Sequence, residues 1–233
     1  MGAKGALVAA ITCDIIDSRR YTGATRQKLN DGIQRAFASI TANKTELDVT
    51  KIDFRITAGD EFQFILRKPE RSLDVVTFLR STLAVQGFKP MARFRTGIGV
   101  GEARYRPSKR ADQRPYEWDG PAFVFAREGL EAIKRQRSPD RWTALLTSDA
   151  ALNRRFDVIL GLVDHLQHSW TTAQWEAIVW TLKGLNRQEA ARRLKVAHQN
   201  VSKRLNAAAW PAVEAGLALI REELSHPPRG ATT

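Results

Sequence analysis

The order in which apolar periodicities follow one another along the chain is the feature that most constrains its fold. Residues 6–13 form a continuous apolar run, long enough for a strand that is buried on both faces. Residues 25–40 then carry apolar side chains at helical spacing. The stretch FRITAGDEFQF, residues 54–64, alternates apolar and polar residues on either side of Gly59-Asp60, which predicts a β-hairpin. The chain therefore begins with a strand, a helix and two strands.

The next segments extend this pattern by helices and strands in alternation. Residues 72–83 have helical spacing, residues 93–100 predict a strand, and Pro121 suits the first turn of a third helix. Residues 142–147 predict a last short strand, whereas the polar and basic residues 104–118 predict a loop. The order β-α-β-β-α-β, followed by one more helix and strand, is that of an α/β (α+β) ferredoxin-like domain. We expect this domain to span residues 1–150.

The remaining chain predicts helices only, and we expect an all-α domain over residues 155–225 with a disordered tail at 226–233. The segment NRQEAARRLKVAHQNVSKRL has the spacing of a helix-turn-helix. The apolar positions that would pack its two helices together are Ala190, Ala191, Leu194, Val196, Val201 and Leu205. Trp170, Trp175 and Trp180 are expected in the core rather than in a platform on which bases stack.

The second helix of this motif is predicted to recognise DNA. The side chains that we expect to contact base edges and phosphates are His198, Gln199, Asn200, Ser202, Lys203 and Arg204. Residues 183–206 contain seven Lys or Arg and a single acid, Glu189, which suits phosphate neutralisation. The alternative interpretation is a helical hairpin with a solvated basic face.

The overall composition agrees with a polyanionic partner, with nucleic acid ahead of a membrane surface. Lys and Arg exceed Asp and Glu by 37 to 25, and the pI is about 10.3. The single cysteine, Cys13, can build neither a disulfide framework nor a zinc site, so we expect a cytoplasmic protein. Asp14 and Asp17 end the first apolar run too early for a membrane span, and we expect no membrane partner.

Two aspartates follow from the predicted sheet as candidate ligands of a divalent cation. In a ferredoxin-like sheet the first strand lies antiparallel beside the second strand of the hairpin. Asp14, at the end of the first strand, should therefore meet Asp60, at the start of the other. Mg²⁺ is commonly held by one or two carboxylates with phosphates and water. Asp17 and Glu61 are weaker candidates, and the alternative is that these acids only serve turns.

Five segments resemble, in the same order over residues 5–152, the class III nucleotidyl cyclases. They are AAITCDIIDSR, ITAGDEF (which also resembles the signature of the diguanylate cyclases), RFRTGIGVGEA, WDGPAFVFAREGLEAI and ALLTSDA. With the C-terminal half included, the chain is similar to the SatD family of bacterial proteins, in which such a domain is joined to a helix-turn-helix.

The resemblance implies a Mg²⁺ site at Asp14 and Asp60, with Arg127 at the position of the arginine that stabilises the transition state. It also implies a homodimer, because class III cyclase sites lie at a dimer interface, and helix-turn-helix proteins usually bind paired half-sites. The residues that it places around the nucleotide phosphates are Ile15, Asp17, Ser18, Arg19 and Gly59.

The chain departs from the cyclase pattern at three places. Phe123 stands where the cyclase helix has an asparagine, one turn before the arginine, and Ile56 and Thr57 stand near the position of the base-selecting residue. Ala58 replaces the second glycine of the diguanylate cyclase signature. Cyclisation needs an oriented ribose and a recognised base, so these departures favour a domain that binds without turnover.

Two functions therefore stay open. The first is a DNA-binding transcriptional regulator whose cyclase-like domain binds a nucleotide or phosphate ligand with Mg²⁺. The second is an active nucleotidyl cyclase, or another phosphoryl-transfer enzyme, that the C-terminal half regulates.

Overall fold

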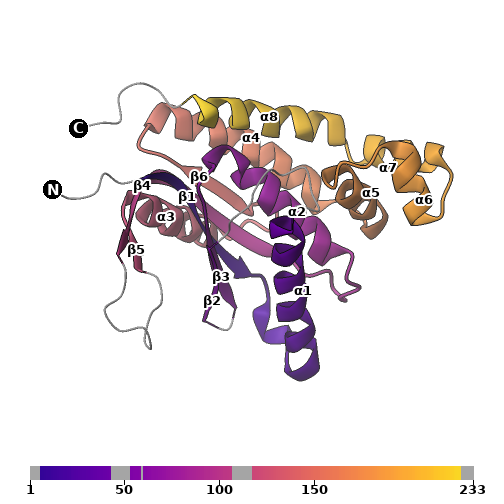
Figure 1. Ribbon diagram of the computed structural model, residues 1–233, viewed down its shortest axis with the longest axis horizontal. Coiled ribbons are helices and arrows are strands. Elements are labelled where there is room, and N and C mark those ends of the chain that lie inside the picture. The colour runs from indigo at the N-terminus through magenta and orange to yellow at the C-terminus, as the bar shows by residue number, and fades with distance from the viewer. Residues whose placement is uncertain (1–5, 43–52, 59, 107–116, 227–233) are drawn as a thin grey trace.

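The computed structural model describes residues 6–42, 53–58, 60–106 and 117–226, and its elements follow the expected order (Figure 1). The strands are β1 (Ala6–Ile15), β2 (Asp53–Ala58), β3 (Glu61–Leu66), β4 (Phe94–Arg106), β5 (Glu117–Asp119) and β6 (Thr143–Leu146). The α-helices are α1 (Gly23–Thr41), α2 (Ser72–Ala84), α3 (Pro121–Gln136), α4 (Ala150–His168), α5 (Thr172–Leu182), α6 (Arg187–Leu194), α7 (His198–Ala207) and α8 (Trp210–Ser225). Two short 3-10 helices are η1 (Ser18–Arg20) and η2 (Pro69–Arg71).

The sheet has the strand order that the sequence predicts. β1 lies between β3 and β4 and is antiparallel to both, and β2 pairs with the outer side of β3. The order β2-β3-β1-β4 with antiparallel neighbours is that of the ferredoxin-like arrangement. The additional strand β6 runs parallel to β4. The α+β prediction is confirmed for this part of the chain.

Strand β1 is buried on both faces, as its unbroken apolar run predicts. Val8 and Ala10 belong to a small core beneath α3, whereas Ile11 and Cys13 belong to the large core on the other face. Successive side chains of a strand point to opposite faces, so each face of the sheet receives every second residue. Burial raises the pKa of the Cys13 thiol to about 12, and this thiol is therefore protonated and unreactive at neutral pH.

Helix α3 lies directly on the backbone of β4 because glycines face it at alternate positions. A Cβ atom at Gly97 would overlap the carbonyl oxygen of Ala126, and one at Gly99 would overlap that of Ala122. At Gly101 the added atom would be 3.1 Å from the Ala122 nitrogen. The segment RFRTGIGVGEA thus encodes the close approach that brings the polar residues of α3 to the sheet.

The loop predicted over residues 104–118 is wrong at both ends. β4 continues to Arg106 and pairs with β5, in a register that sets Arg104 opposite Asp119 and Arg106 opposite Glu117. The opposite charges of Arg104 and Asp119 favour that pairing, although a polar composition by itself indicates a loop. Residues 107–116, with Lys109, Arg110 and Arg114, lie outside the described residues.

The helices after β6 begin earlier than the apolar spacing predicts. Apolar spacing alone predicts helices over 157–170 and 212–223. Instead, α4 starts at Ala150, because Asp149 caps it and accepts hydrogen bonds from the backbone N–H groups of the first turn. Likewise α8 starts at Trp210. None of the described helices combines the length and apolar character needed to cross a bilayer.

One hydrophobic core connects these helices to the sheet. It runs from Phe64 and Phe78 to Trp170, Trp175 and Trp210 without interruption. Trp170 and Trp175 are almost fully buried, with ring centroids 4.6 Å apart, which agrees with the expectation that they are core residues. The division into domains near residue 150 stays a prediction, because the packing is continuous at that point.

A buried ion pair fastens α4 to α2 and to the start of β6. The exposed fractions of the Arg80 and Asp164 side chains are 6% and 0%, and Arg80 Nη1 lies 3.3 Å from Asp164 Oδ1. Asp164 Oδ2 accepts hydrogen bonds from the backbone nitrogens of Trp142 and Thr143, at 2.7 and 2.6 Å. Arg80 also donates to the carbonyl oxygen of Trp142. Burial raises the pKa of Asp164, while the adjacent guanidinium and these donors favour its charged form.

Replacing one member of this pair should destabilise the protein strongly. Asp164→Leu leaves a buried guanidinium without its counter-ion, and we expect the free energy of unfolding to fall by about 3–5 kcal/mol. The double variant Arg80→Met/Asp164→Leu should lose much less than the sum of the two single losses. Urea denaturation followed by circular dichroism measures all three values. Additive losses would show that the two residues do not act as a pair.

Candidate functional site

Five charged side chains gather where β1, β3 and β4 meet one end of α3. Asp14 lies directly opposite Glu61 on one side and Arg95 on the other. Residues opposite each other in an antiparallel sheet point to the same face, so these three side chains form a row on the α3 face. Arg127 and Lys134 of α3 complete the group. We call Asp14, Glu61, Arg95, Arg127 and Lys134 the charge cluster.

Lys134 lies between the two carboxylates of the charge cluster. Its Nζ atom is 3.2 Å from Asp14 Oδ1 and 3.4 Å from Glu61 Oε1. Arg95 Nη1 is 3.5 Å from Asp14 Oδ2, and Arg127 Nη1 is 3.4 Å from Glu61 Oε1. Three cations thus surround two partly buried carboxylates, and Glu131, whose Oε1 atom is 3.7 Å from Lys134 Nζ, balances the third positive charge.

The carboxylates keep Lys134 charged. Partial burial lowers the pKa of this ammonium, but Asp14, Glu61 and Glu131 together outweigh that effect and raise the pKa above its ordinary value. Lys134 is therefore a fixed cation at neutral pH, and it holds the position between two acids that a divalent ion could otherwise take.

Asp60 lies beside the charge cluster but is engaged elsewhere. Its carbonyl oxygen accepts a hydrogen bond from the Ile15 nitrogen at 3.0 Å, and its Oδ2 atom accepts one from Ser18 Oγ at 2.8 Å. Glu61 is the residue opposite Asp14 and its side chain shares the face of Asp14. The preceding residue, Asp60, is therefore on the other face of the sheet. Among the described residues, no hydrogen bond or ion pair is shared by Asp14 and Asp60.

The segment expected to cover nucleotide phosphates follows β1 directly. Ile15 is buried at the strand end, and Asp17 adopts a left-handed conformation with φ 54° before η1. Arg19 is exposed, and Ser18 contacts Asp60. Gly59 lies outside the described residues. That these residues bind a nucleotide stays a prediction.

Sequence reasoning missed Arg95 and Lys134 of the charge cluster, and it gave Glu61 only as a weaker candidate than Asp60. Glu61 follows from the register of the hairpin, because that register sets Glu61, and not Asp60, opposite Asp14. Arg95 is two residues before Gly97 and therefore on the face that α3 covers. Lys134 is seven residues, or two helical turns, after Arg127. The signals for Arg95 and Lys134 need the position of α3, which spacing alone does not supply.

The donors present allow a magnesium ion only with help from a ligand. Within the described ranges, no three or more His, Cys, Asp or Glu side chains gather as a metal site. Asp14 and Asp60 would supply one carboxylate each, and Mg²⁺ accepts such a set when phosphates and water provide the remaining oxygens. Both Asp14 oxygens already contact cations, so a Mg²⁺ ion would have to compete with Lys134 and Arg95.

The second candidate site is the helix pair α6–α7 at the far end of the molecule (Figure 1). Asn186 caps α6, because its side chain accepts a hydrogen bond from the Glu189 nitrogen while the Glu189 side chain accepts one from the Asn186 nitrogen. The two residues form a capping box. Lys195 has φ 55° in the turn, at the slot where a glycine is usual, and α7 begins three residues later. Val201 and Leu205 of α7 are buried against the other helices.

The six predicted DNA-contacting residues of α7 do not share one environment. Four side chains are exposed and Ser202 is partly exposed; the exposed ones are His198, Gln199, Asn200 and Lys203. Arg204 instead points back to α5, where its Nη1 atom lies 3.0 Å from Glu176 Oε2 and 3.4 Å from the Ala173 carbonyl oxygen. In this structure Arg204 therefore holds α7 against α5.

Comparison with known proteins gives one family and a set of distant structures. A family model described as the SatD family matches residues 8–211. No curated protein matches the chain. Similar solved structures include the adenylyl cyclase CyaB from P. aeruginosa, with 14% identity, a TM-score of 0.42, and coverage of 54% of this chain and 70% of that one.

Two more solved structures show the same level of likeness. A bacterial light-regulated adenylyl cyclase has 14% identity, a TM-score of 0.45, and coverage of 60% of this chain and 75% of that one. The guanylyl cyclase domain of the RhoGC fusion protein from the fungus Blastocladiella emersonii has 12% identity and a TM-score of 0.41, with 56% and 76% covered. At these identities and TM-scores the likeness says nothing of activity in this chain.

The position of Lys134 between the two carboxylates can be tested by thermal denaturation, which needs no activity assay. Lys134→Met leaves Asp14 and Glu61 without the ammonium between them, so we expect the melting temperature to fall by about 2–4 °C, which corresponds to about 1 kcal/mol. Added Mg²⁺ should raise the melting temperature of this variant more than that of the wild type, because the cation replaces the lost charge.

Lys28→Met is the matched control, because Lys28 is an exposed lysine on α1 away from the charge cluster. Thermal denaturation with and without Mg²⁺ measures the three proteins. An equal Mg²⁺ effect in all of them would contradict a cation-binding role for Asp14 and Glu61.

Proposed function

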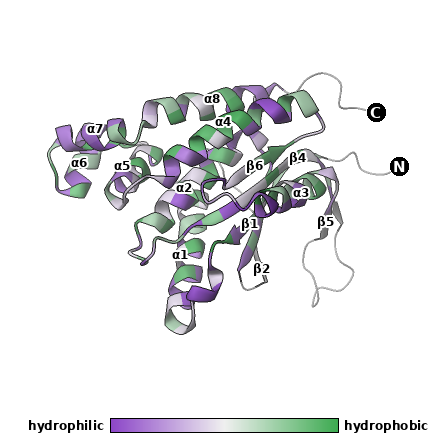
Figure 2. Ribbon diagram, turned by 180° about the vertical axis from the view of Figure 1, so that it is seen from behind, coloured by the Kyte–Doolittle hydropathy of each residue, from purple (hydrophilic) through white to green (hydrophobic). Residues whose placement is uncertain are grey.

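The chain belongs to the SatD family, and we propose that it is a DNA-binding transcriptional regulator whose α/β part binds a nucleotide or another phosphate ligand with Mg²⁺. The observation that carries the DNA-binding proposal is the exposed polar face of α7, which follows a tight left-handed turn after α6. Hydrophilic residues are prominent on α6 and α7, whereas α4 is largely hydrophobic (Figure 2).

The exposed side chains of α7 have the chemistry that recognises base edges. Gln199 and Asn200 lie in the first turn and carry amides that can bond an adenine through two atoms. In helix-turn-helix proteins the N-terminal residues of the second helix enter the major groove. His198, Gln199 and Asn200 occupy these N-terminal positions in α7. Lys203, one turn later, can contact guanine or phosphate.

The remaining cations of this region supply phosphate contacts. Of its seven Lys or Arg side chains, Arg204 pairs with Glu176, while Lys183 and Arg193 lie over the Trp180 ring at 4.7 and 5.9 Å from its centroid. Four exposed cations are left on α6, the turn and α7, namely Arg187, Arg192, Lys195 and Lys203. We infer that these four set the salt dependence of DNA binding.

The charge cluster supports the second part of the proposal. Arg95, Arg127 and Lys134 provide three positive charges at a sheet edge where Asp14 and, beside it, Asp60 offer carboxylate oxygens. Such a set suits the phosphates of a nucleotide bound with Mg²⁺. A homodimer is part of the proposal, since one α7 per subunit would then contact each half of a palindromic site.

DNA binding is tested by fluorescence anisotropy of a labelled duplex across a series of salt concentrations. If the four cations contact phosphates, the logarithm of the binding constant should fall with a slope of about −4 per subunit against the logarithm of salt. Lys203→Glu should weaken binding about tenfold or more and reduce the magnitude of the slope by about 1.

Lys28→Glu makes the same charge change on α1 and should leave binding unaltered. Arg204 is unsuitable for this test because its loss would disturb the contact between α7 and α5. If the wild type shows no salt-dependent binding, or if both variants lose it equally, α7 is not a DNA-recognition helix.

The enzyme alternative has a geometric observation in its favour, because Arg127 lies beside the carboxylates at 3.4 Å from Glu61. Against it, Phe123 packs onto the small core beneath α3, so its position offers a ring rather than an amide to a ribose. We expect no pyrophosphate release from any nucleoside triphosphate with Mg²⁺ or Mn²⁺. Release that disappears in Asp14→Asn would establish the enzyme instead.

A further inference from the structure

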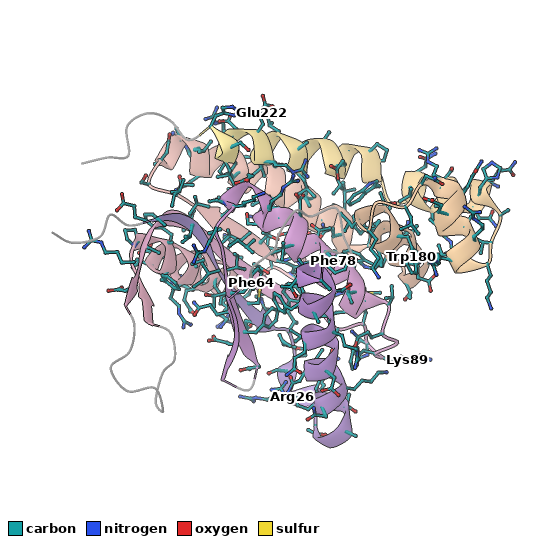
Figure 3. All side chains as sticks on the ribbon, viewed as in Figure 1. Arg26, Phe64, Phe78, Lys89, Trp180 and Glu222 are labelled. Carbon is teal, nitrogen blue, oxygen red and sulfur yellow. The ribbon has the colours of Figure 1, made fainter. Side chains whose placement is uncertain are left out.

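A pocket of about 310 Å³ lies between α1, α2 and α5, away from both sites described above. Phe78 of α2 and Trp180 of α5 belong to its lining and are labelled in Figure 3. Ligand pockets in proteins begin at about 300 Å³, so this volume suits a molecule of one or two rings. The pocket joins the helices that cover the sheet to the helix that supports α6 and α7.

Two side chains that line this pocket each carry a polar atom that is buried without a partner. Thr82 Oγ1, in the last turn of α2, and Gln86 Oε1, two residues beyond that helix, have no hydrogen bond within the described part of the chain. A buried polar atom that lacks a partner destabilises the folded state, so native proteins rarely retain one that serves no function. These atoms point to a ligand that carries a hydroxyl or a comparable polar group.

The charges along the pocket are separated. Glu176 and Lys183 both line it from α5 and are seven residues apart, which is about 10 Å along a helix. Arg35 of α1 adds an exposed cation that has no ion-pair partner among the described residues. Between the charged groups, Phe78 and Trp180 provide aromatic surface. The lining therefore combines an anion-binding group, a flat apolar middle and a polar end.

We propose that this pocket binds a small hydroxylated aromatic carboxylate. The ring packs against Trp180, the carboxylate pairs with Arg35 and Lys183, and the hydroxyl donates to Gln86 Oε1 while Thr82 Oγ1 supplies a further bond. This arrangement satisfies both unpartnered atoms and gives Arg35 a counter-ion. No covalent step is involved.

The same pocket is connected to α6 and α7 by two contacts, and this part of the inference rests on the proposed DNA-binding function. Glu176 pairs with Arg204 of α7, and the Trp180 ring lies under Arg193 of α6. A ligand that packs on Trp180, one helical turn after Glu176, therefore also orders the helices that would contact DNA. A ligand shifts such an equilibrium only by its different affinity for the two arrangements.

Binding is tested on the full chain by isothermal titration calorimetry with 4-hydroxybenzoate. We expect saturable binding with one molecule per chain, and weaker binding of benzoate, which lacks the hydroxyl. Arg35→Ala and Thr82→Val should each weaken 4-hydroxybenzoate about tenfold, since each removes one polar contact.

Thr82→Val keeps the shape of the side chain and removes an unpartnered buried atom, so it should fold at least as well as the wild type. Lys28→Ala removes a charge from α1 outside the pocket and serves as the control for Arg35→Ala. Absence of saturable binding, or equal binding by all variants, overturns the proposal.

The connection to α7 is measured by amide hydrogen exchange, with no DNA present. 4-Hydroxybenzoate should slow exchange in α6 and α7 of the wild type, and Arg204→Gln should remove that protection in α7 while the ligand still binds. Unchanged exchange in the wild type overturns the connection. Failure of DNA binding in the anisotropy experiment overturns the proposed function only, because neither calorimetry nor exchange depends on DNA.

Discussion

The ion pair between Arg80 and Asp164 is the interaction on which the arrangement of the two halves depends. It joins α2, which covers the sheet, to α4, which leads into the C-terminal helices, and it also satisfies the backbone at the start of β6. Because both groups are buried, either one alone would be an uncompensated charge. The pair therefore specifies one docking position for α4, and the position of α5 and of the pocket beneath it follows from that docking.

The order of elements could be predicted from the sequence because each element has a periodicity of its own. β1 is an unbroken apolar run, the hairpin alternates around Gly59-Asp60, and β4 carries glycines at every second position. The extension of β4 to Arg106 could not be predicted in this way, since its polar residues resemble a loop until the pairing with β5 is known. Similarly, the start of α4 depends on the Asp149 cap rather than on apolar spacing.

The candidate site could be predicted only in part for a related reason. Asp14 follows from its place at the end of a buried strand, but its partner depends on a register, and a shift of one residue exchanges Glu61 for Asp60. Lys134 and Arg127 reach the cluster because glycines let α3 approach the sheet, which is a property of packing. The sequence motif identifies the acids, whereas the cations that neutralise them can be identified only when the position of α3 on the sheet is known.

Many of the positive charges of this protein pair with its own acids, so the net positive charge is weak support for DNA binding. Arg80, Arg95, Lys134 and Arg204 all pair with acids of the chain itself. The charge cluster lies on the face of the sheet that α3 covers, whereas α7 packs against α5, α6 and α8. Two residues that line the pocket contact these helices, because Glu176 pairs with Arg204 of α7 and the Trp180 ring lies under Arg193 of α6. The pocket is therefore the better placed of the two sites to influence the DNA binding that we propose for α7.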